Sequence, residues 1–138
     1  MENKTIKKKR TGKIALSLLA VFFIVAFSMA FYRLDQMNKL ESFKSAYGAL
    51  ATDLPNYKLV NSQTYVKEGK QCIAYRVVVK PNLSNDDLCK VFYHTCNDNY
   101  SLHTVWFYSS QQKSSGQYDI AMLDESDRSK WPEISRVN

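Results

Sequence analysis

The chain has 138 residues and a formal net charge of +6, a length that accommodates one small folded domain. Six cations lie in residues 1–13 against Glu2, whereas from Leu34 onward twelve Lys and Arg meet twelve Asp and Glu. The basic balance therefore belongs to the N-terminal flank, and we expect no nucleic-acid partner for the rest of the chain.

The first element is an apolar segment from Ile14 to Tyr32 that carries no charged side chain. As a helix it spans roughly 28 Å, close to the hydrocarbon thickness of a bilayer. The basic tail, residues 1–13, would keep the N terminus in the cytoplasm. We therefore predict a single-pass protein of the cell membrane, with residues 14–32 as transmembrane helix and the remainder as an extracytoplasmic part.

A cleaved signal peptide is the alternative for the same segment. Ser28 and Ala30 are small residues at the two positions that signal peptidase reads, so cleavage after Ala30 would release a secreted domain. The apolar run continues to Tyr32, however, and is longer than the roughly 7–15 residues of a signal-peptide core. A retained span is therefore favoured.

Residues 33–55 are predicted as a juxtamembrane helix. Leu40, Phe43, Tyr47 and Leu50 recur at helical spacing and form one apolar stripe. The stripe either packs on the adjacent domain, which we favour, or pairs two copies as a homodimer. Pro55 prevents the helix from continuing.

Residues 56–123 are predicted as a small α+β domain, followed by a polar C-terminal tail, residues 124–138, that is partly disordered. Alternating apolar residues indicate strands, and Ser84 with Asp86 and Asp87 favours a helix start. The predicted strands are 57–66, 71–80, 102–108 and 118–123, with a helix over 84–97. This β-β-α-β-β order predicts one helix on an antiparallel or mixed sheet, and the run at 102–108, apolar on both faces, predicts a central strand.

Three stretches, AYRVVVKPNLSNDDL, VWFYSS and YDIAML, resemble a small domain of uncharacterised bacterial exported and membrane-linked proteins. The resemblance covers residues 57–122 and places Arg76 to Pro81, then Asn82 to Asn97, then Val105 to Tyr108 in the family's strand, helix and strand. The family's glycine-rich approach to the last strand is reduced here to Gly116. The resemblance implies a fold and an extracytoplasmic setting, without a known activity or functional residues.

The cysteines are Cys72, Cys89 and Cys96, an odd number that allows at most one internal bridge. We favour buried free thiols first, then a bridge from Cys72 to Cys96 or Cys89. A Cys89–Cys96 bridge comes last, because seven residues along a helix separate the Cα atoms by about 10.5 Å, beyond the ~7 Å limit. None of the spacings forms the C-x-x-C of a redox enzyme.

Catalytic and cofactor signatures are weak. His94 and His103 are the only histidines, and a zinc site with Cys96 would need unusual ligand spacing, so surface histidines are favoured. Cys89 as nucleophile with His103 as base lacks a third orienting group. No glycine-rich phosphate loop is present in the sequence. We therefore expect no cofactor, no metal and no catalytic residue.

Aromatic residues gather in the second half of the chain and suggest a binding surface, because large amphipathic rings are favoured at interfaces. The candidate interface residues are Tyr100, Trp106, Phe107 and Tyr108. We predict a membrane-anchored protein-interaction domain that binds an unknown protein or envelope component. The alternative is a small extracytoplasmic thiol- or metal-dependent enzyme using Cys89, Cys96 and His103.

Overall fold

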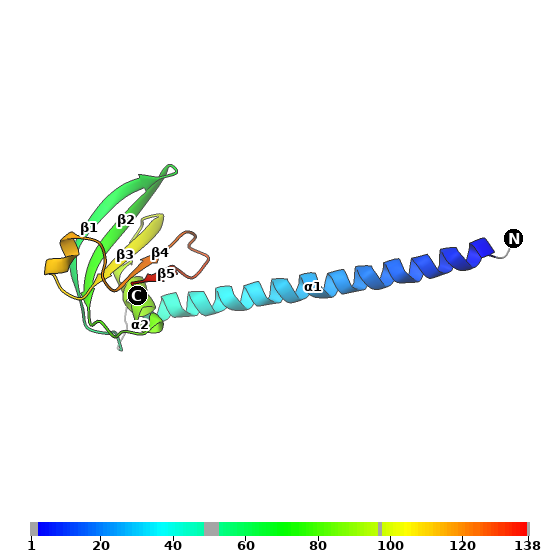
Figure 1. The fold of residues 1–138 in the computed structure, drawn as a ribbon, viewed down its shortest axis with the longest axis horizontal. Helices are drawn as coiled ribbons and strands as arrows, with labels where there is room; N and C mark the ends of the chain where they lie inside the picture. Colours follow the sequence, from blue (N-terminus) through cyan, green and yellow to red (C-terminus); the bar gives the residue numbers. More distant parts are fainter. Residues whose placement is uncertain (1–2, 49–52, 97, 138) are drawn as a thin grey trace. The chain divides into compact units, whose positions relative to one another are not determined.

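The structure is a computed structural model that describes residues 3–48, 53–96 and 98–137. The chain divides into two compact units, Met1–Asn38 and Lys39–Asn138. Helix α1, Asn3–Tyr47, runs from the first unit into the second, and the remaining elements all belong to the second unit (Figure 1).

The first unit consists of the larger part of α1, whose apolar side chains are exposed to the surroundings. Phe22 is 68% exposed and Phe31 is 65% exposed, and the other large apolar residues from Leu16 to Leu34 are also exposed. Within the described residues, α1 is the one helix long and apolar enough to cross a membrane, a test that a signal sequence also passes. The predicted apolar helix is thereby confirmed, while its crossing of a membrane remains a prediction.

The second unit begins with the last turns of α1. Leu40 is only 1% exposed, and Phe43 and Tyr47 pack against the core of the domain. The apolar stripe is therefore used within the chain, as we favoured; Leu50, its fourth predicted member, lies outside the described residues. The predicted helix over 33–55 is too long, because α1 ends at Tyr47. At Gly48 a Cβ atom would lie 2.6 Å from the carbonyl oxygen of Lys44, so a larger residue does not fit there.

The domain is built on a mixed sheet with the strand order β1-β2-β3-β4-β5. Neighbouring strands are antiparallel except β2 and β3, which are parallel. A parallel pair requires a crossover connection, and α2 supplies it. The strands are β1 Tyr57–Lys67, β2 Lys70–Val79, β3 Leu102–Tyr108, β4 Ala121–Asp124 and β5 Glu133–Arg136.

The α+β class and the mixed sheet agree with the sequence prediction, but the β-β-α-β-β layout is incomplete. A fifth strand, β5, forms in the segment that was predicted to be a polar, partly disordered tail, and it pairs with β4. Strand pairing is made by backbone groups, so a short polar segment can join a sheet edge without an apolar alternation. The central position predicted for residues 102–108 is correct, since β3 is the third strand of five.

Helix α2, Asn85–Thr95, begins at the predicted cap. The hydroxyl of Ser84 accepts a hydrogen bond from the backbone N–H of Asp87 at 3.1 Å, and the Asp87 carboxylate accepts one from the Ser84 N–H at 3.3 Å. This reciprocal capping box satisfies two N–H groups that the helix start would otherwise leave unpaired. A short 3₁₀ helix, η1 (Gln112–Ser115), lies in the connection between β3 and β4.

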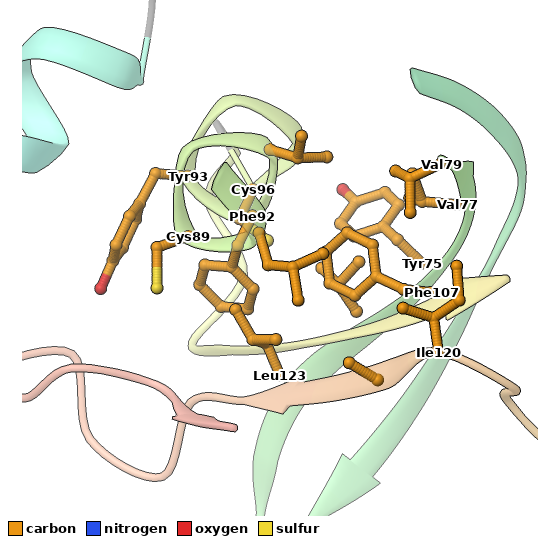
Figure 2. Close-up of a cluster of buried hydrophobic side chains, with 14 of the residues drawn as sticks. Tyr75, Val77, Val79, Cys89, Phe92, Tyr93, Cys96, Phe107, Ile120 and Leu123 are labelled. Carbon is orange, nitrogen blue, oxygen red and sulfur yellow. The ribbon is translucent and has the colours of Figure 1, made fainter. Parts of the chain in front are cut away.

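The core lies between α2 and one face of the sheet. Figure 2 shows Phe92 of α2 and Phe107 of β3 in one cluster of side chains, and both are completely buried. On β2, Ile73, Val77 and Val79 face inward and belong to this buried cluster. We call the opposite side of the sheet, which carries Arg76 and Trp106, the outer face.

Candidate functional site

A buried imidazole with two carboxylate partners lies at the start of β3. His103 is 1% exposed. Its Nδ1 lies 2.8 Å from Oε2 of Glu125, and its Nε2 lies 2.7 Å from Oδ1 of Asp98. Both ring nitrogens therefore face carboxylate oxygens, an arrangement that the doubly protonated imidazolium satisfies by donating two hydrogen bonds.

Backbone pairing brings these groups together. Glu125 directly follows β4, and its N–H donates to the carbonyl oxygen of His103 at 2.8 Å, which extends the β3–β4 pairing by one residue. Asp98 lies in the connection from α2 to β3, where it accepts hydrogen bonds from the Tyr75 hydroxyl and, at 2.9 Å, from the Tyr100 N–H. The cluster thus ties the α2–β3 connection and the chain after β4 to β3.

The electrostatics agree with a charged histidine. Burial alone would lower the pKa of His103, but the hydrogen bonds to Glu125 and Asp98 outweigh this and raise the pKa above its ordinary value. Burial of Asp98 acts to raise its pKa, yet the hydrogen bonds from Tyr75 and His103 lower it overall. His103 and its two carboxylate partners therefore form a buried hydrogen-bonded cluster in which the raised pKa favours the protonated imidazole.

A cavity of about 460 Å³ lies beside this cluster. His103 and Glu125 form part of its wall, together with Glu41, Lys44, Gly48, Tyr93, Cys96, Arg128 and Ser129. The hydroxyl of Tyr93 is buried and has no hydrogen-bond partner among the described residues. In Figure 2 this hydroxyl points away from Phe92 and the rest of the labelled cluster.

The cysteines are all buried free thiols, the arrangement that we favoured. The predicted bridge from Cys72 to Cys96 or Cys89 does not form. Cys72 neighbours the inward-facing Ile73 on β2, so it lies on the outer face, whereas Cys89 and Cys96 belong to the core on the α2 side. Burial, with the charge of Asp86, raises the pKa of Cys89 to about 11. Burial, followed by the charges of Glu125 and Asp98, raises the pKa of Cys96 well above its ordinary value.

The histidines are already engaged by other side chains. The hydroxyl of Tyr57 lies 2.6 Å from Nδ1 of His94, and both nitrogens of His103 face carboxylates. In the part of the chain that the structure describes, no group of three or more His, Cys, Asp and Glu is arranged to hold a metal ion. The residues named for the alternative enzyme, Cys89, Cys96 and His103, are thus two buried thiols and an imidazole whose nitrogens both face carboxylates.

The predicted interface residues divide into two groups. Phe107 and Tyr108 are 0% and 1% exposed, so the prediction that they form an accessible surface is wrong. Phe107 lies in the core, and the Tyr108 hydroxyl donates to the carbonyl oxygen of Gly116 at 3.0 Å, beside η1. Trp106 and Tyr100 are half-buried, and Tyr100 packs against the core, which leaves Trp106 on the outer face.

Trp106 is joined on the outer face by an arginine that was not among the predicted interface residues. The guanidinium carbon of Arg76 lies 4.7 Å from the centre of the Trp106 ring, a distance at which cation and ring attract each other. Its Nη1 donates to the Asn61 side chain over a long 3.4 Å, and its buried Nε has no partner among the described residues. The alternation of β2 places Arg76 on this face, so its position there was predictable from the sequence; its stacking on Trp106 was not.

Comparison of the chain with protein-family models, with curated proteins and with solved structures finds no match in any of the three. The resemblance of residues 57–122 to a bacterial exported domain therefore stays a prediction.

Proposed function

We propose that the chain is a single-pass membrane protein whose α1 helix anchors a small extracytoplasmic domain, and that this domain binds another protein or an envelope component without catalysing a reaction. The observation that carries the proposal is the exposure of the large apolar side chains from Leu16 to Leu34. A soluble monomer rarely exposes a continuous apolar surface of this size. Lipid can cover this apolar surface without leaving backbone N–H and C=O groups unpaired, because a helix pairs these groups internally.

The proposed orientation rests on charge. The flank before the apolar segment carries Lys7, Lys8, Lys9 and Arg10, and short basic flanks stay on the cytoplasmic side. The non-catalytic part of the proposal is supported by the engaged nitrogens of His103 and by the raised pKa values of Cys89 and Cys96. The binding part is supported by the half-buried Trp106 and Arg76 on the outer face.

Protease digestion of sealed cells tests location and orientation together. A tag after Asn138 should be removed by external protease, whereas a tag before Met1 should be protected until the membrane is opened. Mass spectrometry of the N terminus separates the anchored form from a secreted one, since cleavage after Ala30 would produce a chain that begins at Phe31. A C-terminal tag that resists protease in sealed cells would overturn the proposal.

A further inference from the structure

Among the described residues, the β1–β2 hairpin concentrates positive charge that no carboxylate balances. Residues 57–80 contain a single acidic residue, Glu68, against five cations, which leaves the hairpin at +4: Lys58, Lys67, Lys70, Arg76 and Lys80. Since residues from Leu34 onward sum to zero, the remainder of that part of the chain carries −4. The neutrality of the domain is therefore an average over two oppositely charged regions.

The lysines outside the hairpin behave differently. Lys44, Lys90, Lys113 and Lys130 each lie within ion-pair distance of a carboxylate. Inside the described residues, Lys67, Lys70 and Lys80 have no such partner, and the Nζ of Lys58 donates to the neutral side chain of Gln111 at 2.7 Å. The hairpin thus presents cations whose charge the domain itself leaves uncompensated.

The strand register places these cations on one face. Lys58 pairs with Val78 and Lys67 pairs with Lys70, so all three basic side chains lie on the outer face with Arg76 and Trp106. The other face of β1 carries apolar residues that α2 does not cover. Leu59 is 48% exposed and Val66 is 71% exposed.

Strand β1 is also an open edge of the sheet. It is the first strand in the order, it has 11 residues, and most of them are exposed. An edge of this length presents unpaired backbone groups to any extended chain of suitable sequence. Its lysines repel a second copy of the same edge, because like charges on facing strands are unfavourable, but they attract acidic residues.

We infer that the β1–β2 hairpin binds an extended segment of a partner protein in which acidic and aliphatic residues alternate, and that this segment adds to the sheet as a strand beside β1. The inference rests on the proposed binding function and specifies its partner. On the added strand, every second residue lies beside the outer face, where acidic side chains meet Lys58 and Lys67. The residues between them cover Leu59 and Val66.

The test uses the full-length chain in mild detergent micelles and a labelled peptide of alternating glutamate and valine, as long as β1. Fluorescence anisotropy measures its affinity, with empty micelles as the blank. A peptide of the same composition, with glutamates and valines in separate blocks, keeps the charge and removes the alternation. The alternating peptide should bind at least about tenfold more tightly than the block peptide, and it should slow hydrogen exchange of the β1 amides.

Charge reversal identifies the site. Lys67→Glu combined with Lys70→Glu should weaken binding of the alternating peptide by at least about tenfold, and the Lys67→Gln, Lys70→Gln pair should give an intermediate loss. Lys130→Glu, an exposed lysine outside the hairpin, is the matched control and should leave the affinity unchanged. Tryptophan fluorescence verifies that each variant is folded.

Three results would overturn the inference. The two peptides could bind equally, which would mean charge attraction without strand addition. Charge reversal could leave the affinity unchanged. Vesicles of phosphatidylglycerol could bind in a hairpin-dependent way while the peptide does not, which would assign the cations to lipid headgroups. The proposed function fails separately, if the domain is found inside the cell by protease protection.

Discussion

The cluster of His103, Asp98 and Glu125 allows a quantitative prediction about stability. Removing the imidazolium by His103→Gln leaves Glu125, whose side chain is only 2% exposed, without its cationic partner. Breaking one member of a buried charge pair typically costs about 3–5 kcal/mol. We therefore expect the free energy of unfolding of the domain to fall by about that amount, a large part of the stability of a domain this small.

The dependence on pH identifies the charge state. Because the pKa of His103 is raised in the folded state, its stabilisation is fully present below the unfolded value of about 6.5 and is lost as the pH rises through the folded value. Between those two values the stability of the native chain should fall by up to about 1.4 kcal/mol per pH unit. The His103→Gln variant should lack this decline, since it has no proton to lose there.

The measurement is a urea titration of the full-length chain in mild detergent micelles at a series of pH values. The two tryptophans, Trp106 and Trp131, both lie in the second unit, so their fluorescence reports unfolding of the domain rather than of the apolar helix. His94→Gln is the control, because it removes the other histidine and leaves the cluster intact. An equal alkaline decline in the native chain and in His103→Gln would show that His103 is not the buried cation.

Three further predictions concern other parts of the domain. A maleimide reagent should label none of Cys72, Cys89 and Cys96 in the native chain at neutral pH and all of them in urea, because the thiols are buried; stoichiometric native labelling would contradict this. Ser84→Ala should lower the free energy of unfolding by about 1 kcal/mol, because the helix cap is lost. Ser84→Thr should retain most of the stabilisation that the cap provides. Burial opposes ionisation of Asp119, but hydrogen bonds from Lys113 and Ser109 lower its pKa to about 2. The ionised Asp119 therefore stabilises the fold above about pH 4, and this stabilisation is lost as the pH falls from about 4 to about 2. Asp119→Asn should reduce the loss of stability over that pH range, as followed by tryptophan fluorescence. An equal loss in the native chain and in the variant would count against a stabilising role for the hydrogen bonds of Asp119.

The parts of the fold that depend on local patterns were predictable. The alternation over residues 71–80 predicted strand β2, and Ser84 predicted the start of α2, because both signals are contained within a few consecutive residues. The end of α1 was placed too far along the chain. Gly48 was the better stop signal there, and the prediction relied on Pro55 instead.

The parts that depend on long-range pairing were not predictable. Glu125 meets His103 only because β3 pairs with β4 in one particular register, and neither segment alone specifies that register. Asp98 reaches His103 from the connection between α2 and β3, where the hydroxyl of Tyr75 on β2 also donates to it. The burial of Tyr108 depends on the connection that follows β3, where its hydroxyl donates to the carbonyl oxygen of Gly116. Both faces of β3 are apolar, so the sequence does not show that η1 and the chain after it cover the end of the outer face.

The part of α1 that packs on the folded domain is distinct from the apolar segment that is proposed to cross the membrane. The Phe43 ring lies 5.1 Å from the Trp131 ring and 5.9 Å from the Tyr93 ring, centre to centre, and Leu40 is buried in the same cluster. Residues from Lys39 onward therefore belong to the folded domain. Cleavage after Ala30 would leave all of these contacts in place. An anchored form and a released form would then share one fold and present the β1–β2 hairpin identically, so substitutions within residues 14–32 should change where the domain resides without changing its affinity for the alternating peptide.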